Sequence, residues 1–477
     1  MIDIYKRLGK GFFYSMLAQG GSYLIAFFLA PIYARAMAPE EYAVVSFANS
    51  LRNVLIMLMP MGVGGAVVYW YNQYLENQEE QRRSVGGIVV LSTIYSIFWL
   101  IIFLLTGNAV IEKGFGDIGL PFYPYGILIG VSAFLFSFST VPVSLFIAKE
   151  KIALNSILQV SFGLIQTLII IVFVAYLKKG AKGQIVAVFL SGLLFLFVYL
   201  YFIFKDMKLT FNIKLFKDVS KFSIPFLPHS MFMWILNLSD RMIISYFGKR
   251  FIRDLGFYSF GYAIGMVMQG IMSAFNTIWS AVFMKEVNSN KDAKNVLGKT
   301  GSYGILLLAF CASGLILFSE EAVIILSGGR YEESAKYVPP IVLGYFFQGV
   351  YMFPGMALYY LKKTHLFPII TASGATVNIS INIFGIPKWG VMTASVSTCA
   401  GFFVMSLLAF VFGHFPYPLK YRALPLILSL VMLISSMLFF YVFKIGLVFK
   451  SLFLILFGGI SVYCWIQDLK KEEKSNG

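Results

Sequence analysis

Three charged residues, Arg52, Asp240 and Arg241, lie inside long apolar stretches of this 477-residue chain. A charge near the middle of a bilayer costs about 2.5–3.5 kcal/mol on insertion scales, so such residues normally face a water-filled cavity or a partner. Arg52 is the candidate for phosphate binding, because a guanidinium presents a planar fork of donors that matches phosphate oxygens. The alternative role for Arg52 is structural, in a buried ion pair with Asp240.

Asp240 is the candidate for carrying a proton or a sodium ion. His229 precedes it by 11 residues, which at about 100° per residue returns to nearly the same helix face. Arg241 points about 100° away from Asp240, so the two are not facing partners. A salt bridge between Asp240 and a basic residue of another helix is the alternative. Pro225 and Pro228 predict a bend near the start of this stretch.

Uncharged polar side chains form stripes on three other apolar stretches. The stripes are Asn155, Gln159 and Gln166, then Gln269, Ser273, Asn276 and Ser280, and finally Asn378 and Asn382. Helix–helix hydrogen bonds, worth about 0.6 kcal/mol each in measured cases, explain any single residue as well as a ligand would. Three stripes in one chain favour a wet central cavity.

Fourteen long apolar stretches position these residues. Hydrophobic residues make up 59% of the chain and charged residues 13%. About 20 apolar residues span a bilayer as a helix, whereas barrel strands would alternate over about 10 residues. The sequence therefore predicts an all-α integral membrane protein. The predicted spans are 11–34, 42–72, 84–106, 120–147, 154–177, 183–204, 222–247, 255–283, 301–318, 338–361, 366–386, 391–412, 423–443 and 446–466.

The distribution of Lys and Arg predicts the orientation. With the N-terminus in the cytosol, the cytosolic loops hold most of the basic residues, as the positive-inside rule requires, and both termini are then cytosolic. The net charge of +16 is scattered over short loops, which fits anionic lipid and not nucleic acid. The first apolar stretch is too long for a signal peptide, so we expect it to remain as a helix.

The chain resembles a doubled unit. A shift of 213 residues places 11–34 on 224–247, and it covers an even number of helices, so both copies have the same orientation. Parallel repeats of this kind characterise several transporter folds. We expect two pseudo-symmetric six-helix bundles and an appended C-terminal helix pair. The expected domains are 1–204, a linker at 205–221, 222–412 and 413–477.

The linker at 205–221 is the most basic loop. Asn212 is a plausible N-cap, and apolar residues follow it at helical spacing. This pattern predicts a short amphipathic helix on the inner membrane surface; a solvated linker is the alternative.

Signals for an enzyme are weak. Gly298-Lys299-Thr300 lacks the first glycine of a P-loop, and the three histidines are dispersed. Cys311, Cys399 and Cys464 have no disulfide or metal spacing, and they read as packing residues. Acid pairs such as Glu320-Glu321 are expected in solvated loops. We expect no metal, no cofactor and no catalytic residues.

Three motifs carry a family resemblance over roughly residues 5–412. The first is Phe222-Ser-Ile-Pro-Phe-Leu-Pro-His229 continuing to Trp234-Ile-Leu-Asn-Leu-Ser-Asp-Arg241. The second is Ile325-Leu-Ser-Gly-Gly-Arg-Tyr331 followed by Val338-Pro-Pro-Ile, and the third is Asn378-x-x-x-Asn382 running on to Ile386-Pro-Lys-Trp-Gly390. With them the chain resembles the polysaccharide flippases, for O-antigen or capsule repeat units, of the multidrug/oligosaccharidyl-lipid/polysaccharide exporter superfamily.

The resemblance implies transport of a polyprenyl-diphosphate-linked oligosaccharide across a bacterial plasma membrane by alternating access. Arg52 matches a position where such proteins often hold a basic residue, and Asn237, Asp240 and Arg241 match a motif in the seventh helix. The implied partners are lipid-linked oligosaccharide and membrane lipids, with a polymerase and glycosyltransferases as further candidates. A cation-coupled multidrug exporter of the same fold and a membrane sugar polymerase or transferase are the alternatives.

Overall fold

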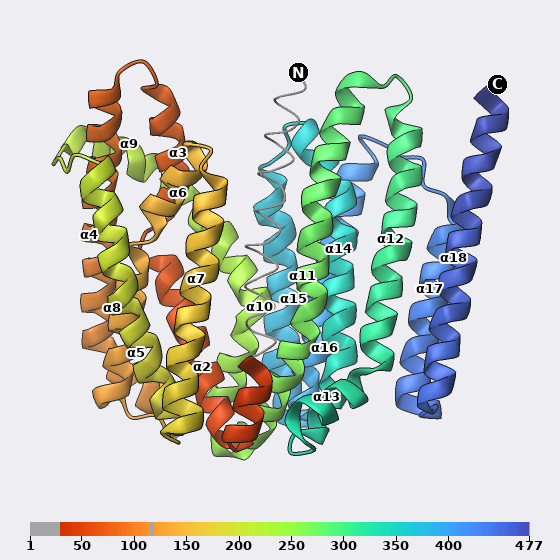
Figure 1. Cartoon of the computed structure of the whole chain (residues 1–477), viewed down its shortest axis with the longest axis horizontal. Coiled ribbons are helices and arrows are strands. Elements are labelled where there is room, and N and C mark those ends of the chain that lie inside the picture. Colours follow the sequence, from red (N-terminus) through yellow and green to blue (C-terminus); the bar gives the residue numbers. More distant parts are fainter. Residues whose placement is uncertain (1–28, 115–118, 477) are drawn as a thin grey trace. The chain divides into compact units, whose positions relative to one another are not determined.

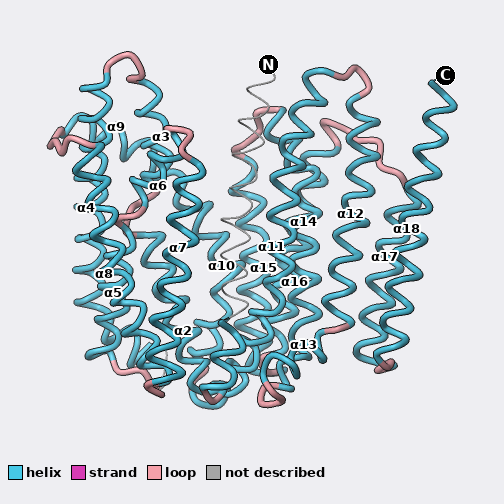
Figure 2. Tube along the Cα trace, viewed as in Figure 1, coloured by secondary structure: helices cyan, strands magenta, loops and turns pink. Residues whose placement is uncertain are grey.

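The computed structural model describes residues 29–114 and 119–476, and within these ranges the chain forms helices and short connections without a strand (Figure 2). Twelve of the helices described there are long and apolar enough to cross a membrane. In a bilayer, helices satisfy their own backbone hydrogen bonds, which is why so apolar a chain takes this form. The predicted all-α membrane architecture is confirmed.

Two of the fourteen predicted spans are not among these twelve. Most of the stretch 11–34 lies outside the described residues. The described part of the chain begins at residue 29, and residues 29–36 are helical. The stretch 222–247 forms α10 (Leu227–Tyr246), whose polar residues, Asp240 and Arg241 among them, lower its hydropathy. The count of fourteen is therefore not confirmed. Helix α10 is thus not among the twelve because of its composition, and it is the helix that carries Asp240 and Arg241.

Packing divides the chain into two compact units, which we describe separately. Unit 1 comprises residues up to Ser259 together with Asn382–Val391, and unit 2 comprises Phe260–Ile381 and Met392–Gly477. Helix α10, which the sequence prediction placed in the second bundle, packs within unit 1. The domain boundaries expected from the internal repeat remain a prediction.

The helices follow each other with short connections (Figure 1). Unit 1 contains α2 (Pro39–Leu58), α3 (Val63–Gln73), α4 (Gln78–Asn108), α5 (Ile127–Ser137), α6 (Thr140–Ala148), α7 (Ile152–Ile171), α8 (Gly180–Asp206), α9 (Ile213–Ser223) and α10. Two helices contribute to both units: α11 (Ile252–Ser289) and α15 (Leu366–Trp389). Unit 2 contains α12 (Ala293–Leu317), α13 (Ser319–Ser327), α14 (Val338–Tyr360), α16 (Met392–His414), α17 (Ala423–Leu438) and α18 (Leu447–Asn476).

Two spans of unit 1 are broken, which the sequence analysis did not predict. The span 39–73 divides into α2 and α3 at Pro60, where Met61 and Gly62 have positive φ values of 48° and 74°. Proline removes a helical donor, and the left-handed backbone that follows suits glycine. The span 122–148 divides into α5 and α6 at Phe138.

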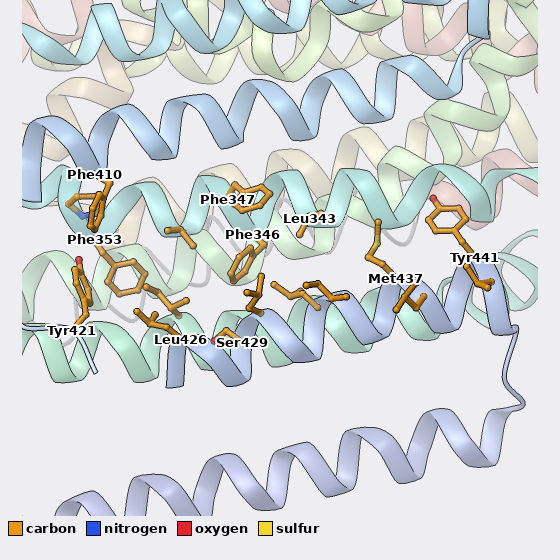
Figure 3. Close-up of a pocket in the computed structure, with 18 residues that line it drawn as sticks. Leu343, Phe346, Phe347, Phe353, Phe410, Tyr421, Leu426, Ser429, Met437 and Tyr441 are labelled. Atoms are coloured by element: carbon orange, nitrogen blue, oxygen red, sulfur yellow. The ribbon is translucent and has the colours of Figure 1, made fainter. Parts of the chain in front are cut away.

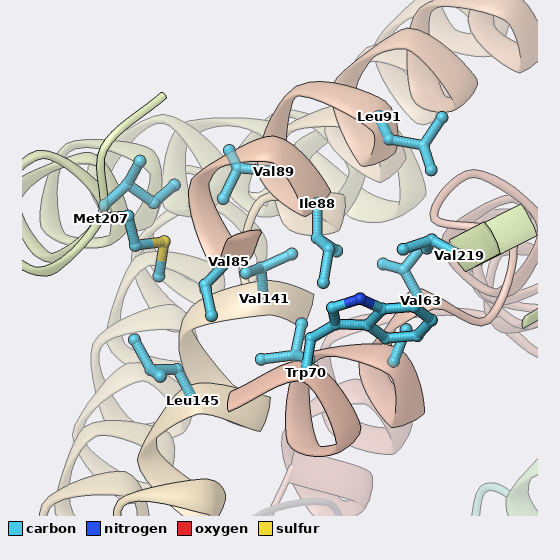
Figure 4. Packing of buried hydrophobic residues seen from close by; sticks show 13 residues of the cluster. Val63, Trp70, Val85, Ile88, Val89, Leu91, Val141, Leu145, Met207 and Val219 are labelled. Carbon is cyan, nitrogen blue, oxygen red and sulfur yellow. The ribbon is translucent and has the colours of Figure 1, made fainter. Parts of the chain in front are cut away.

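The broken helices pack in matching halves, α2 against α5 and α3 against α6. One apolar cluster joins residues of α2 and α5, including Leu51 and Ala133. Another joins α3, α4 and α6, with Trp70 beside Val85, Ile88 and Val141 (Figure 4). Each half of a broken span therefore has an apolar core of its own.

A helix, α9, forms where the sequence predicted the linker helix, and its place on the inner membrane surface remains a prediction. The Asn212 side chain caps it by accepting a hydrogen bond from the backbone N–H of Leu215 at 3.1 Å. Val219 is fully buried in the cluster with α3 and α4, whereas Lys214 and Lys217 are exposed. A tight turn at Ile224–Phe226 separates α9 from α10, at the position where the prolines predicted a bend.

In unit 2, α14 packs along α16, and α12 packs along α17. The terminal pair α17 and α18 lies side by side, in the blue segment of Figure 1. Lys450 of α18 is buried and donates to Glu321 of α13 at 2.7 Å. The expectation that the pair Glu320-Glu321 is merely solvated is thus wrong, because the partner comes from a helix more than 120 residues away.

Candidate functional site

The carboxylate of Asp240 is fully buried, and neutral donors from two other helices bind it. The Tyr258 hydroxyl of α11 donates to Oδ2 at 2.7 Å, and the Asn382 amide of α15 donates to Oδ1 at 2.6 Å. Tyr258 and Asn382 are themselves fully buried. Burial of a carboxylate is costly unless it is hydrogen-bonded, so this three-helix network keeps Asp240 in place.

Arg241 leaves α10 in another direction and meets other partners. Its Nε donates to the Ser46 hydroxyl of α2 at 3.1 Å, and one terminal nitrogen donates to the Asn237 carbonyl at 2.9 Å. The guanidinium carbon also lies 5.8 Å from the centre of the Tyr258 ring. Asp240 and Arg241 together attach α10 to three neighbouring helices.

Arg52 of α2 has a different environment. Its Nε and Nη1 atoms are buried and have no hydrogen-bond partner within residues 29–114 and 119–476, the part of the chain that the structure describes. The guanidinium carbon lies 5.3 Å from the centre of the Phe136 ring of α5, a cation–π contact. Asp240 is bound by Tyr258 and Asn382, so the two charged groups that the sequence suggested as an ion pair have different neighbours here.

A polar group that sequence reasoning missed lies one turn before Arg52. Asn49 of α2 accepts a hydrogen bond from the Gln184 amide of α8 at 3.3 Å, and Gln184 is buried. Tyr258 and Ser46, which bind Asp240 and Arg241, were also missed. Each is a polar residue inside an apolar stretch, but serine and tyrosine are common in membrane helices, so composition alone did not single them out.

The polar stripe of α7 makes hydrogen bonds within its own helix. The Gln159 amide donates to the Asn155 side chain at 3.1 Å, and Asn155 is buried. Gln166, two turns further along, has a buried amide nitrogen for which no described residue offers a hydrogen-bond acceptor. His229, near the start of α10, is half-buried.

The stripes of the other two helices differ from each other. On α11, Gln269 is half-buried and Asn276 is exposed, with Ser280 bonded to the carbonyl of Asn276 at 2.8 Å. On α15, Asn378 is fully buried and donates to the Ser397 hydroxyl of α16 at 3.2 Å, as a helix–helix contact would. Asn378 and Asn382 therefore bind different helices, although they lie one turn apart.

Unit 2 contains an apolar groove of about 650 Å³ between α14 and α17. Phe346, Phe347 and Leu343 of α14 face Leu426 and Met437 of α17 across it (Figure 3). Ile305 of α12 and Phe410 of α16 also line the groove, together with Tyr421 and Tyr441. The composition of this groove suits a hydrocarbon chain and not a sugar.

Solved structures with a similar fold are membrane transporters. A structure of the lipid II flippase MurJ in an inward closed conformation superposes with a TM-score of 0.79 at 16% identity, over 96% of this chain and 99% of that one. An inward-facing multidrug transporter of the MATE family gives a TM-score of 0.64 at 15% identity, over 83% of this chain and 94% of that one. At such identities these likenesses show the fold.

Sequence relatives point to polysaccharide biosynthesis. The succinoglycan biosynthesis transport protein ExoT of Rhizobium meliloti is 23% identical over 340 residues, which are 68% of this chain and 64% of that protein. The match thus spans just under two thirds of the relative's length. The model of the family described as polysaccharide biosynthesis protein matches residues 8–283. Because that match covers more than half of the chain, this multi-pass membrane protein belongs to the polysaccharide biosynthesis protein family.

Proposed function

We propose that the chain is a flippase that moves a polyprenyl-diphosphate-linked oligosaccharide from the inner to the outer leaflet by alternating access, for surface polysaccharide synthesis. Family membership and the flippase-like fold support transport in this pathway. The chain then resides in a bacterial plasma membrane with both termini in the cytosol. The single observation that carries the substrate class is the environment of Arg52.

Arg52 is a charged residue inside a span, and two of its buried nitrogen atoms lack acceptors among the described residues. An unsatisfied buried donor costs about 1–3 kcal/mol, and more for a charged group, so a folded protein retains it where a ligand supplies the acceptors. Oxygen atoms of a diphosphate are such acceptors, and hydrogen bonds between guanidinium and phosphate are among the strongest in proteins. Phe136 covers the guanidinium without competing for its N–H groups. Arg52 therefore binds the diphosphate of the substrate.

The groove of unit 2 takes the polyprenyl tail. Its walls are almost entirely hydrocarbon and aromatic, and α17, which forms one wall, is itself a membrane span. Transfer of an isoprenoid chain out of water or a polar cavity into such a surface is favourable in proportion to the apolar area buried. The tail thus stays in an apolar environment while the sugar crosses.

Asp240 is the candidate for coupling to a proton or sodium ion. It is a buried carboxylate inside the membrane region that accepts hydrogen bonds from Tyr258 and Asn382. The other candidate cavity residues, Asn237, Arg241, Gln159, Gln166, Gln269, Asn276, Asn378 and Asn382, remain proposals, with His229 as a second coupling candidate. A polymerase is a proposed partner because it would consume the transported unit, and glycosyltransferases are proposed partners because they would assemble that unit before transport.

Deletion of the gene, followed by complementation, tests the function. Lipid-linked repeat units are expected to accumulate on the cytosolic leaflet of the deletion strain, and wild type is expected to restore surface polysaccharide. Arg52→Gln at equal membrane abundance is expected to restore little, and Lys151→Gln, an exposed cation in a loop, is the matched control. Unchanged surface polysaccharide and leaflet distribution after deletion would show that the function is wrong.

The groove has its own test. Leu433→Trp places a larger side chain among the lining residues, whereas Ile427→Trp places it at an exposed position of α17 outside the groove. Transport of the lipid-linked substrate is expected to fall severalfold in the first variant and not in the second. Equal transport by both variants would remove the groove from the proposal.

A cation-coupled multidrug exporter is the second candidate, and the fold likeness to a MATE transporter together with the buried carboxylate of Asp240 favours it. Drug accumulation and resistance assays in the deletion strain distinguish the two. Increased drug sensitivity with normal surface polysaccharide would favour the exporter.

A further inference from the structure

Unit 1 contains a small polar pocket that the proposed transport function does not use. It has a volume of about 150 Å³, and its lining comes from the ends of four helices: α3, α4, α6 and α8. The lining residues are Tyr71, Gln78, Gln81, Arg82, Val85, Leu145, Lys149, Lys205 and Asp206. Water occupies about 30 Å³ per molecule in the liquid, so the pocket has the capacity of about five waters, enough for a phosphate group.

The pocket is positively charged. Arg82, Lys149 and Lys205 face a single anion, Asp206. Lys149 and Asp206 form a half-buried ion pair at 3.1 Å, and they neutralise each other. The charges of Arg82 and Lys205 remain, so the lining as a whole attracts an anion.

Donors in the pocket are held in place and remain available. One terminal nitrogen of Arg82 donates to the carbonyl of Lys205 at 3.0 Å, which fixes the guanidinium, while its other nitrogen atoms have no hydrogen-bond partner among the described residues. The side-chain amide of Gln78 likewise has no such partner there. The Lys205 ammonium is held by the Tyr201 hydroxyl at 3.2 Å and supplies charge from the rim.

The walls of the pocket are tied together by the chain that follows α8. The backbone N–H of Lys208 donates to the carbonyl of Arg82 at 3.0 Å, and the Thr210 hydroxyl donates to the carbonyl of Arg83 at 2.9 Å. Gly86 permits this approach, since a Cβ there would lie 2.0 Å from the Lys208 carbonyl oxygen. Val85 and Leu145 form the apolar floor, which continues into the cluster of Figure 4. The pocket is therefore preformed.

We propose that this pocket binds the phosphate group of an anionic phospholipid headgroup. Candidate spans end at Gln73, Ala148 and Asp206 and begin at Gln78, so the lining residues lie where membrane segments meet the polar headgroup region. Lys and Arg at that level attract anionic lipids, and a guanidinium with available donors binds phosphate oxygens specifically. Free phosphate has the same chemistry and is the other source that the experiment must distinguish.

The test uses the purified full chain in bilayer nanodiscs of mixed phosphatidylglycerol and phosphatidylcholine. Native mass spectrometry counts the phosphatidylglycerol retained by wild type, by Arg82→Gln/Lys205→Gln, and by Lys151→Gln/Lys214→Gln. The last variant has the same charge change at exposed positions on the same side of the membrane, outside the pocket. Glutamine at position 82 can still donate to the Lys205 carbonyl, which limits damage to the fold.

The pocket variant is expected to retain phosphatidylglycerol roughly tenfold less than wild type, and the control variant is expected to match wild type. Equal losses of phosphatidylglycerol retention in both variants would show a diffuse attraction between the charged surface and the lipid, and would overturn the proposal. Unchanged retention in both would also overturn it.

Two further arms complete the test. Gln78→Glu adds an anion at the rim without removing any hydrogen bond, so it is expected to reduce retention even if the double variant misfolds; unchanged retention contradicts the proposal. Inorganic phosphate added to protein in neutral detergent is expected to leave the unfolding temperature unchanged, whereas phosphatidylglycerol raises it. Stabilisation by phosphate alone, without retention of the lipid, would overturn the assignment to a lipid headgroup.

Discussion

Two arginines inside unit 1, Arg241 and Arg52, have opposite environments. Arg241 donates to Ser46 and to the Asn237 carbonyl, next to an Asp240 whose carboxylate also has two donors. Arg52 lies over the Phe136 ring, and two of its buried nitrogen atoms have no partner in the described part of the chain. A buried charged group whose hydrogen bonds are made connects helices, whereas one with unpaired donors can gain hydrogen bonds when a ligand binds. The comparison supports a structural role for Arg241 and is the basis for proposing a binding role for Arg52.

The largest effect is expected from a change in the hydrogen-bonded group of this comparison, at Asp240 beside Arg241. Asp240→Leu leaves the Tyr258 hydroxyl and the Asn382 amide buried without their acceptor, and we expect a loss of about 3–5 kcal/mol in the free energy of unfolding. Unfolding of the purified protein, monitored by circular dichroism in detergent, measures it. A loss below about 1 kcal/mol would show that the network is not structural.

Arg52→Ala tests the role of the arginine that has unpaired donors. We expect transport to fall by roughly ten- to a hundredfold, because hydrogen bonds to charged groups contribute about 1.5–3 kcal/mol, while stability stays the same or rises. Flipping of a lipid-linked oligosaccharide in proteoliposomes gives the rate, and the unfolding midpoint gives stability. If the variant transports normally and unfolds easily, Arg52 is a structural residue and the comparison fails.

Asp240→Asn keeps the shape of the network and removes the charge. We expect a stability loss of about 1 kcal/mol, since one of two hydrogen bonds must rearrange, together with loss of the dependence of transport on pH or on the sodium gradient. Transport rates across a pH series, with and without sodium, measure the second effect. Intact transport with an unchanged pH and sodium response would exclude Asp240 from coupling.

The smallest effect is expected for Phe136→Leu. This substitution removes the cation–π contact with Arg52, worth about 0.5–1 kcal/mol, and keeps an apolar neighbour. Transport is expected to fall only a few-fold, less than for Arg52→Ala, in the same proteoliposome assay. Phe134→Leu on the same helix is the control. A larger effect than that of Arg52→Ala would mean that Phe136 acts independently of the arginine.

Local patterns predicted much of the fold. The Asn212 cap and the spacing of apolar residues after it predicted α9, and the lengths of the apolar stretches predicted the terminal pair α17 and α18. These features depend on neighbours a few residues apart. The breaks of the spans at Pro60 and Phe138 were missed, because apolar length alone does not reveal where a helix stops hydrogen-bonding inside a membrane.

Site residues were harder to interpret than helices. Sequence reasoning selected Arg52, Asp240 and Asn382 because polar groups in apolar stretches are costly. It could not say that Asn382 binds Asp240 across 142 residues, or that Lys450 reaches Glu321 across 129. Such pairs have no spacing rule.

The sequence by itself determined that the chain is a bundle of membrane helices and which side chains carry charge into them, because the cost of polar groups in hydrocarbon depends on composition along one helix. Only the tertiary structure decided which of these charges have partners. Hydrogen bonding needs two groups within about 3 Å, and packing brings those groups together from distant parts of the chain. That is why Arg241 and Arg52, similar in sequence context, differ in their environments.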